Sequence, residues 1–257
     1  MRDILESVAA GEVSPAAAEA KLRGYATGDA GRFDAARERR SGVPEAVLAD
    51  GKTPAEVASL VATSLDTTGR AIATRLQDEQ ATAVRERLEA SFPDASIRLH
   101  ARVGVLVATR PSFDRAELDA SVGVVTAGTS DAVPAGEAAV IAGEMGARTD
   151  RIDDVGVAAL TRLTDQLDRL RSHDVLVVAA GREGALPTVV AGLVDVPVIG
   201  LPVSTGYGHG GNGEAALSGM LQSCTALSVV NVDAGFTAGA QAGLIARQID
   251  ATRTAEE

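Results

Sequence analysis

The sequence predicts an α/β protein in which a three-layer, parallel-sheet C-terminal domain follows a smaller N-terminal α/β lobe with a helical start. The 257-residue chain is 46% hydrophobic but only 2% aromatic, so its core must be built from Ala, Val, Leu and Ile. Short β-branched runs alternate with helical stretches in the second half, which is typical of parallel strands covered on both faces. Only six charged side chains occur between residues 173 and 245, so much of that region is expected to be buried.

The N-terminal lobe is expected to span residues 1–115. Helices are predicted over 2–9 and 14–25, the second opened by Ser14 as cap and Pro15 as first-turn proline. Residues 29–52 show no regular pattern and are expected to be irregular. The later elements are predicted to be a helix over 54–64, a strand over 70–75, a helix over 78–90, and strands near 96–100 and 102–108.

The C-terminal domain is expected to span 119–251, with a frayed tail over 252–257. The predicted strands cover 121–126, 147–152, 173–179, 196–201 and 227–232, the second being the weakest. The predicted helices cover 132–146, 157–170, 187–193, 213–224 and 236–251. Such alternation implies right-handed crossovers and an open sheet, and ligands of such sheets bind at the carboxyl ends of the strands.

The charge balance excludes some classes of partner. The net charge is −11, with 35 acidic residues against 24 basic ones, of which only Lys21 and Lys52 are lysine. This balance argues against nucleic acid, because a basic face supplies most of that affinity. An acidic, lysine-poor composition is also typical of proteins kept soluble in high salt, so we expect a salt-adapted source.

The same composition bears on location. No run approaches the roughly 18 apolar residues that cross a bilayer, and the start has no signal-peptide apolar region. The single cysteine, Cys224, excludes an intramolecular disulfide and a multi-cysteine metal site. We therefore expect a cytoplasmic protein that has no membrane partner.

Polar residues follow several predicted strands. The segment Gly128-Thr129-Ser130-Asp131 closes the first strand of the domain, and its amides and hydroxyls suit a phosphate or carboxylate, although a plain helix cap explains them equally. Glu183 follows the third strand, where an acid accepts a proton, holds a ribose hydroxyl or binds a metal, or merely completes a turn.

The segment 202–213 is rich in glycine, which indicates a loop approached closely by an anionic ligand. It matches neither a Rossmann fingerprint nor a Walker loop, and its His209 fits a surface residue better than a ligand. A lone cysteine such as Cys224 is by default a small buried hydrophobe. Asp233 either caps the last helix or faces the same cleft. On these residues alone, the chain is an enzyme or binding protein for a phosphate-bearing small molecule.

The ordered set of motifs resembles the LarB family. The C-terminal motifs are Gly128-Thr129-Ser130-Asp131, Asp154-Val155-Gly156-Val157-Ala158, Glu183-Gly184-Ala185-Leu186-Pro187, Ser204-Thr205-Gly206-Tyr207-Gly208, Ser223-Cys224 and Asn231-Val232-Asp233-Ala234-Gly235-Phe236. The N-terminal motif is Arg40-Ser41-Gly42-Val43-Pro44-Glu45 with Gly51-Lys52. The C-terminal half is in turn similar to PurE-type aminoimidazole ribonucleotide carboxylases, which implies a flavodoxin-like sheet.

The resemblance implies carboxylation and hydrolysis of nicotinic acid adenine dinucleotide, with carbon dioxide or bicarbonate as co-substrate and Mg²⁺ assisting. The products would be pyridinium-3,5-biscarboxylic acid mononucleotide, an intermediate of the nickel-pincer nucleotide cofactor, and AMP. Cys224 would be the covalent catalyst, and Glu183 or Asp154 is the candidate group that handles the proton. The substrate-binding residues it implies are Gly128, Thr129, Ser130, Asp131, Arg162, Ser204, Thr205, Gly206, Tyr207, Lys52, Arg40, Glu45 and Asp233. No metal ligands are assigned.

One position departs from the family pattern. A histidine is expected before Arg162, but this chain has Thr161. An aminoimidazole ribonucleotide carboxylase or mutase is the alternative enzyme, and Thr161 argues against it because the proton donor would be missing. A non-catalytic nucleotide-binding protein is the other alternative. The low charge of residues 173–245 and the resemblance together predict a homo-oligomer, from a dimer to an octamer.

Overall fold

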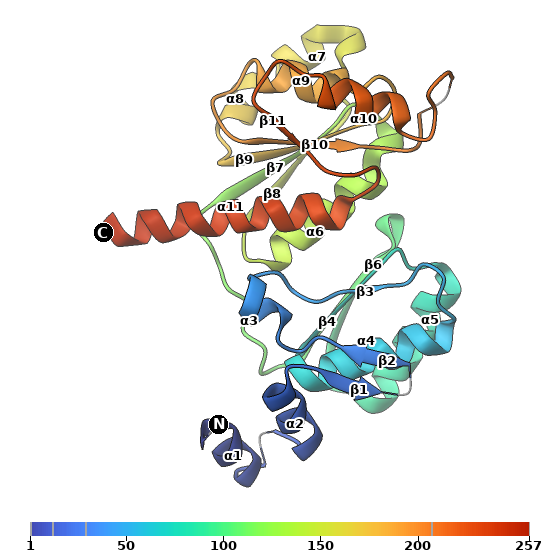
Figure 1. Ribbon diagram of the computed structural model, residues 1–257, viewed down its shortest axis with the longest axis vertical. Helices are drawn as coiled ribbons and strands as arrows, with labels where there is room; N and C mark the ends of the chain where they lie inside the picture. The colour runs from blue at the N-terminus through green and yellow to red at the C-terminus, as the bar shows by residue number, and fades with distance from the viewer. Residues whose placement is uncertain (1, 12, 29, 207, 257) are drawn as a thin grey trace. The chain divides into compact units, whose positions relative to one another are not determined.

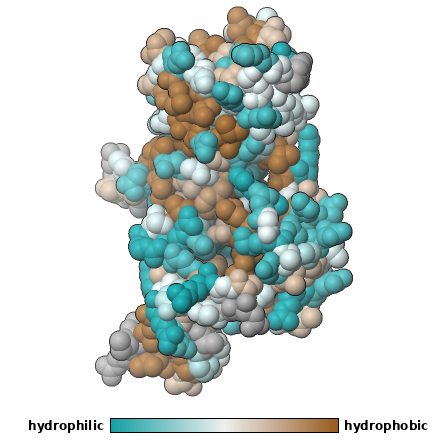
Figure 2. All heavy atoms as spheres, turned by 45° about the vertical axis from the view of Figure 1, so that its right-hand side comes forward, coloured by the Kyte–Doolittle hydropathy of each residue, from teal (hydrophilic) through white to brown (hydrophobic). Residues whose placement is uncertain are grey.

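A computed structural model describes residues 2–11, 13–28, 30–206 and 208–256 of the chain. The chain divides into two compact units, Met1–Asp114 and Arg115–Glu257, each with its own hydrophobic core (Figure 1). Both units combine helices with a sheet, which confirms the predicted α/β class. On the face shown in Figure 2, hydrophobic residues gather over the C-terminal unit, in keeping with its few charges.

A four-stranded sheet organises the N-terminal unit, in the order β3-β4-β6-β5. Its strands are β3 (Val47–Leu48), β4 (Arg70–Thr74), β5 (Ser96–His100) and β6 (Val105–Thr109), with the short η1 helix (Ala101–Val103) before β6. The helices α4 (Pro54–Thr68) and α5 (Asp78–Ser91) pack against the sheet. A capping box between Thr53 and Glu56 fixes the start of α4.

The first 48 residues are more regular than the sequence predicts. The elements there are α1 (Arg2–Ala9), α2 (Pro15–Arg23), the antiparallel strands β1 (Ala26–Gly28) and β2 (Gly31–Phe33), α3 (Arg37–Ser41) and β3. The expectation of an irregular segment over 29–52 is therefore wrong. Elements of two to five residues are too short to show a hydrophobic period, and α3 buries none of its residues.

A five-stranded, fully parallel sheet organises the C-terminal unit, in the order β11-β10-β9-β7-β8. Its strands are β7 (Ser121–Thr126), β8 (Arg148–Ile152), β9 (Val175–Ala180), β10 (Val198–Pro202) and β11 (Leu227–Val229). Every residue of β9 and β10 is buried, which explains their continuous apolar sequences. The order reverses between β7 and β9, where doubly wound sheets hold their ligands.

Helices cover both faces of this sheet. One face carries α6 (Ala132–Glu144) and α11 (Gly235–Glu256), and the other carries α7 (Leu160–Thr164), α8 (Leu167–Arg171), α9 (Ala185–Ala191) and α10 (Glu214–Leu221) (Figure 1). The short η2 (Thr129–Asp131) and η3 (Val157–Ala159) helices follow β7 and β8. The single helix predicted over 157–170 is thus three shorter ones, because Thr164 and Asp165 are poor helix formers.

The last helix is longer than the sequence predicts. Gly235 and Gly239 of α11 lie against backbone carbonyls of α6, so the two helices pack too closely for side chains there. The expected frayed tail over 252–257 is wrong for the described residues, because α11 continues to Glu256. Arg253 anchors this last stretch with an ion pair to Asp174 at 2.6 Å. None of the described helices, α11 included, combines the length and apolar character needed to cross a bilayer.

Candidate functional site

The carboxyl ends of four neighbouring strands enclose a pocket of about 510 Å³ in the C-terminal unit. Its walls come from the segments that follow β7, β8, β9 and β10, as expected for a doubly wound sheet. Seven of the predicted site residues line it, namely Gly128, Ser130, Asp131, Arg162, Glu183, Thr205 and Gly206. Part of the set of strand-end residues that the sequence singles out therefore gathers around one cavity.

The segment after β7 supplies one wall of the pocket. The Asp131 carboxylate accepts a hydrogen bond from the Gly128 amide at 2.8 Å, which closes the turn before α6. Asp131 is only 2% exposed. Burial raises the pKa of its carboxyl, although the hydrogen bond from the Gly128 amide opposes the rise. Asp131 thus both caps the turn and borders the cavity, so the cap and ligand interpretations are compatible.

The segment after β9 supplies the acid. Glu183 is exposed on the pocket wall, and the next residue, Gly184, has the left-handed φ of 70° and lies against the backbone of Ala216. Arg182 also lines the pocket, and the sequence analysis missed it as a site residue. Its position directly after a buried strand is the signal that could have identified it.

The glycine-rich segment after β10 is held from two sides. Gly206 lies against the carbonyl oxygen of Gly181, and the Thr205 hydroxyl donates to the Ser130 carbonyl at 3.3 Å. The Ser204 amide donates to the Asp233 carboxylate at 2.9 Å. Asp233 therefore fixes the start of this segment and does not line the pocket. Tyr207 lies outside the described residues.

The segment after β8 contributes Arg162, which forms an ion pair with Asp154 at 2.9 Å. Arg162 lines the pocket whereas Asp154 does not, and Asp154 has the left-handed φ of 61°. Thr161, the position where the family pattern has histidine, is exposed on α7. Thr129, in η2, likewise flanks the pocket without lining it.

Cys224 lies at the amino ends of the strands, whereas the pocket lies at their carboxyl ends. It is exposed and sits between the end of α10 and Leu227, the first residue of β11. Because β10 and β11 are parallel, this connection returns to the amino ends of the strands. Five residues of strand span about 16 Å. The Cys224 thiol is therefore remote from the pocket of its own chain.

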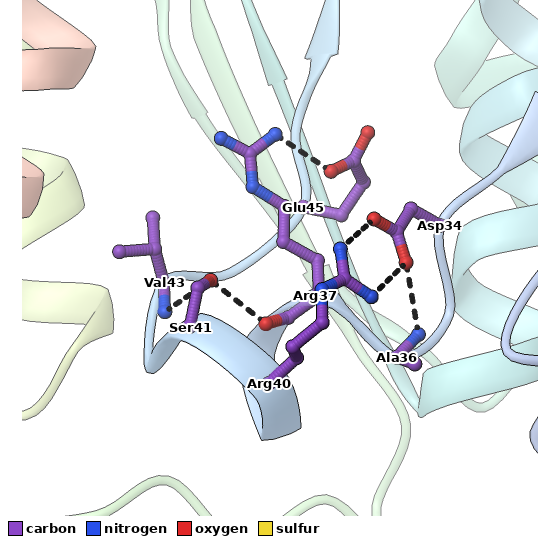
Figure 3. Close-up of polar contacts among 7 residues, drawn as sticks. All are labelled: Asp34, Ala36, Arg37, Arg40, Ser41, Val43 and Glu45. Atoms are coloured by element: carbon purple, nitrogen blue, oxygen red, sulfur yellow. Dashed lines mark hydrogen bonds and ion pairs between the residues drawn. The ribbon is translucent and has the colours of Figure 1, made fainter.

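The three remaining predicted residues belong to the N-terminal unit, where each has a local partner. Arg40 pairs with Asp34 at 2.6 Å, and Glu45 accepts a hydrogen bond from Arg37 at 2.8 Å (Figure 3). The Lys52 ammonium donates to the Leu48 carbonyl at 2.6 Å. Within this unit they order a loop and a turn, and none lines the pocket of the C-terminal unit.

Fold and pocket together define a class, an α/β protein with a pocket at the switch point of a parallel sheet, the place where such sheets hold small ligands. Residues 25–108 match the family model of the LarB/PurE-like N-terminal domain, and residues 121–256 match that of AIR carboxylase. The uncharacterized protein MJ0165 of Methanocaldococcus jannaschii is 37% identical over 219 residues, which is 84% of each chain. The chain belongs to the LarB family, and its C-terminal unit is a PurE-like domain.

Proposed function

We propose that the chain carboxylates the pyridinium ring of nicotinic acid adenine dinucleotide and hydrolyses its phosphoanhydride. The products are pyridinium-3,5-biscarboxylic acid mononucleotide and AMP, and carbon dioxide or bicarbonate supplies the carbon. The observation that carries the proposal is the strand-end pocket, in which hydroxyls and arginines gather beside the acids Asp131 and Glu183 in a chain of the LarB family.

The pocket suits a phosphate-bearing ligand. Its volume of about 510 Å³ falls in the range of roughly 300–1,000 Å³ that is usual for small-molecule sites. Ser130 lies just before the start of α6, where a hydroxyl and the positive end of the helix dipole favour an anion. Arg182 and Arg162, the latter paired with Asp154, bring guanidinium groups to the pocket lining.

The proposed carboxylation needs a nucleophile because a pyridinium ring is electron-poor and does not attack carbon dioxide. Addition of the Cys224 thiolate at ring carbon four gives a neutral dihydropyridine, whose carbon five then attacks carbon dioxide and forms the new carbon–carbon bond. Glu183 takes the proton from carbon five as the carbon–sulfur bond breaks, which restores the aromatic ring and the thiolate. Water then cleaves the phosphoanhydride, and AMP leaves.

The position of Cys224 makes a second copy of the chain part of the proposal. About 16 Å of strand separates the two edges of the sheet, so a thiol at the amino edge does not reach a ring bound at the carboxyl edge of the same chain. A homo-oligomer in which Cys224 of one copy enters the pocket of another resolves the conflict. The exposure of Cys224 and of its neighbour Leu221 fits such an interface.

The resemblance to the LarB family implies that Mg²⁺ assists the reaction. Among the described residues, no three His, Cys, Asp or Glu side chains gather so as to hold a metal ion. In nucleotide enzymes Mg²⁺ commonly uses one or two carboxylates together with substrate phosphates. We propose that Mg²⁺ enters with the substrate phosphates, and no step of the proposed mechanism depends on it.

The direct test is incubation of the purified protein with nicotinic acid adenine dinucleotide, ¹³C-bicarbonate and Mg²⁺, followed by mass spectrometry. We expect AMP and a mononucleotide that carries one labelled carboxyl group. Conversion of aminoimidazole ribonucleotide instead would identify the alternative enzyme, which is favoured by one observation, the AIR carboxylase match over residues 121–256. Binding without turnover of either compound would identify a nucleotide-binding protein.

Substitution of Cys224 tests both the chemistry and the need for a second copy. Cys224→Ser is expected to abolish carboxylation and to keep folding and substrate affinity, because an alkoxide is far harder to form than a thiolate at neutral pH. Co-assembly of Cys224→Ser with a pocket variant such as Arg162→Ala should restore part of the activity if the thiol acts between copies. Full activity of Cys224→Ser would refute the thiolate mechanism, and failure to restore activity would refute its action between copies.

A further inference from the structure

Asp154 has no part in the proposed mechanism, although the sequence analysis names it among the candidate catalytic residues. The segment that contains it follows β8 and is tied to the end of the neighbouring strand β7 (Figure 1). The Thr126 hydroxyl, which is fully buried, donates to the Asp153 carboxylate at 3.0 Å and accepts from the Asp154 amide at 3.1 Å. The next two amides, of Val155 and Gly156, donate to carbonyls at the end of β7. These hydrogen bonds fix the backbone on both sides of Asp154.

The backbone of Asp154 adopts a conformation that residues other than glycine rarely take. Its φ is 61°, in the left-handed region, where the Cβ of an ordinary residue is crowded. Conformations of this kind persist only where the surrounding structure holds them, and they are concentrated at functional sites. In this conformation the Asp154 carboxylate reaches the Arg162 guanidinium of α7 at 2.9 Å.

The ion pair between Asp154 and Arg162 adds little to the stability of the fold. The two side chains are 56% and 44% exposed, and exposed pairs contribute little. Its effect is on the direction of the Arg162 side chain. A half-exposed arginine samples many rotamers, and ordering it opposes the binding of a ligand. A fixed carboxylate beside the guanidinium meets that cost before a ligand arrives.

The pair leaves Arg162 able to bind. A guanidinium carries five N–H donors in a planar fork, so a contact of one nitrogen with a carboxylate does not exhaust it. Arg162 lines the pocket, whereas Asp154 does not. The Asp154 carboxylate therefore acts on a bound ligand through the guanidinium.

We propose that Asp154 is a positioning residue, which holds Arg162 toward the pocket for an anionic group of the ligand and transfers no proton in the reaction. Arginine suits this role because its planar fork binds two oxygens of a phosphate or carboxylate at once. The inference rests on the proposed function for the identity of the ligand, a nucleotide that carries phosphate groups. The binding of the anion does not itself require carboxylation.

The test is a double-mutant cycle on the full-length protein, with affinities measured by isothermal titration calorimetry. The probes are nicotinic acid adenine dinucleotide and inorganic pyrophosphate. Asp154→Gly is expected to weaken the binding of both about tenfold, but to cause no further loss in an Arg162→Ala background, because Asp154 acts through Arg162. Loss of a carboxylate beside an anion site by itself strengthens anion binding, so a weaker affinity has to come from the lost position of Arg162.

Two variants at the same position separate the side chain from the backbone. Glycine adopts a left-handed φ freely, so Asp154→Gly should keep or raise the melting temperature while it loses affinity. Asparagine also tolerates this region, and its side-chain oxygen accepts from Arg162. Asp154→Asn should therefore restore the affinity to within about threefold of the wild type.

Asp153→Asn is the matched control. It removes the same charge one residue earlier, where the carboxylate pairs with Arg151 at 2.7 Å, so it should leave both affinities unchanged. Pyrophosphate separates this inference from the proposed function. If the protein binds pyrophosphate but not the dinucleotide, the proposed substrate is wrong, and the cycle with pyrophosphate still decides the role of Asp154.

Several results would overturn the inference. One is an equal loss of affinity from Asp154→Gly with and without Arg162, and another is an equal loss from Asp153→Asn. Failure of the wild type to bind either probe would also overturn it. Loss of turnover by Asp154→Asn at unchanged affinity would assign proton transfer to Asp154 and give it a catalytic role instead.

Discussion

The carboxyl ends and the amino ends of the strands in the five-stranded sheet differ in the groups that they present. Here the carboxyl edge and the amino edge denote these two ends of the strands. At the carboxyl ends of the strands, Gly128, Gly181 and Gly206 bring bare backbone to the pocket. At the amino edge, side chains pair across long stretches of sequence, as Arg253 does with Asp174. The carboxyl ends of the strands thus border a pocket, and the amino ends are linked to the last helix by an ion pair.

Two aspartates show the same difference in their pKa values. Burial raises the pKa of Asp131 at the carboxyl edge, and the Gly128 amide offsets only part of that rise. Burial also acts on Asp174 at the amino edge, but the hydrogen bonds from Arg253 and the Ser121 amide outweigh it and lower the pKa. An ionised Asp131 therefore costs stability at neutral pH, whereas an ionised Asp174 contributes it. Functional sites commonly contain a buried carboxylate whose hydrogen bonds offset only part of the cost of its desolvation.

The largest effect is expected from a substitution at the point where the loop after β10 contacts the end of β9. Gly206→Ala should lower substrate affinity by at least about a hundredfold, because a Cβ would overlap the Gly181 carbonyl oxygen and displace the loop. Isothermal titration with nicotinic acid adenine dinucleotide measures this loss. Gly143→Ala in α6 is the control, because its Cβ would meet only Thr149 at 3.8 Å. Equal affinities of the two variants would show that the loop does not form the ligand site.

A smaller effect is expected at Asp131, where charge and hydrogen bonding are separable. Asp131→Asn keeps an acceptor for the Gly128 amide and removes a buried charge, so thermal stability at pH 7 should be kept or raised. Asp131→Ala should cost about 1 kcal/mol, the usual loss of a cap. Both variants, and Ser130→Ala, should bind the dinucleotide about tenfold more weakly.

A different outcome at Asp131 and Ser130 would contradict this prediction. If Asp131→Asn and Ser130→Ala bind the dinucleotide with unchanged affinity while Asp131→Ala only lowers the melting temperature, the segment is a helix cap alone. In that case the polar residues at both ends of the strands would serve only to stabilise the fold. The proposed difference between the two ends would then be wrong.

The sequence predicts most of the sheet and part of the site. Central strands such as β9 and β10 are recognisable because their burial on both faces leaves continuous apolar runs. The residues after those strands fall around one pocket because parallel strands share a carboxyl edge. Short elements such as α3 escape prediction because five exposed residues show no period.

What the sequence does not predict depends on partners far along the chain. The end of α11 is held by Asp174, which is 79 residues away from Arg253. The edge at which Cys224 lies follows from the direction of β11, not from its neighbours in sequence. The partners of Arg40 and Glu45 likewise required the folded turn around α3. A resemblance to a family points to such residues, but it does not show where they lie in the folded chain.

The smallest effect is expected at the amino edge itself, where Arg253→Gln removes the partner of Asp174. The ion pair is partly exposed, so a decrease of only a few degrees in melting temperature is expected, with no change in dinucleotide affinity. The pH dependence identifies the cause. Because the folded-state pKa of Asp174 is lowered, its contribution is present above its ordinary value near 4 and is lost as the pH falls through the lowered pKa. The wild type and Arg253→Gln should therefore differ in melting temperature at pH 7 and converge in strong acid. A difference that persists unchanged in strong acid would mean that Arg253 stabilises α11 by packing its side chain and not by its charge.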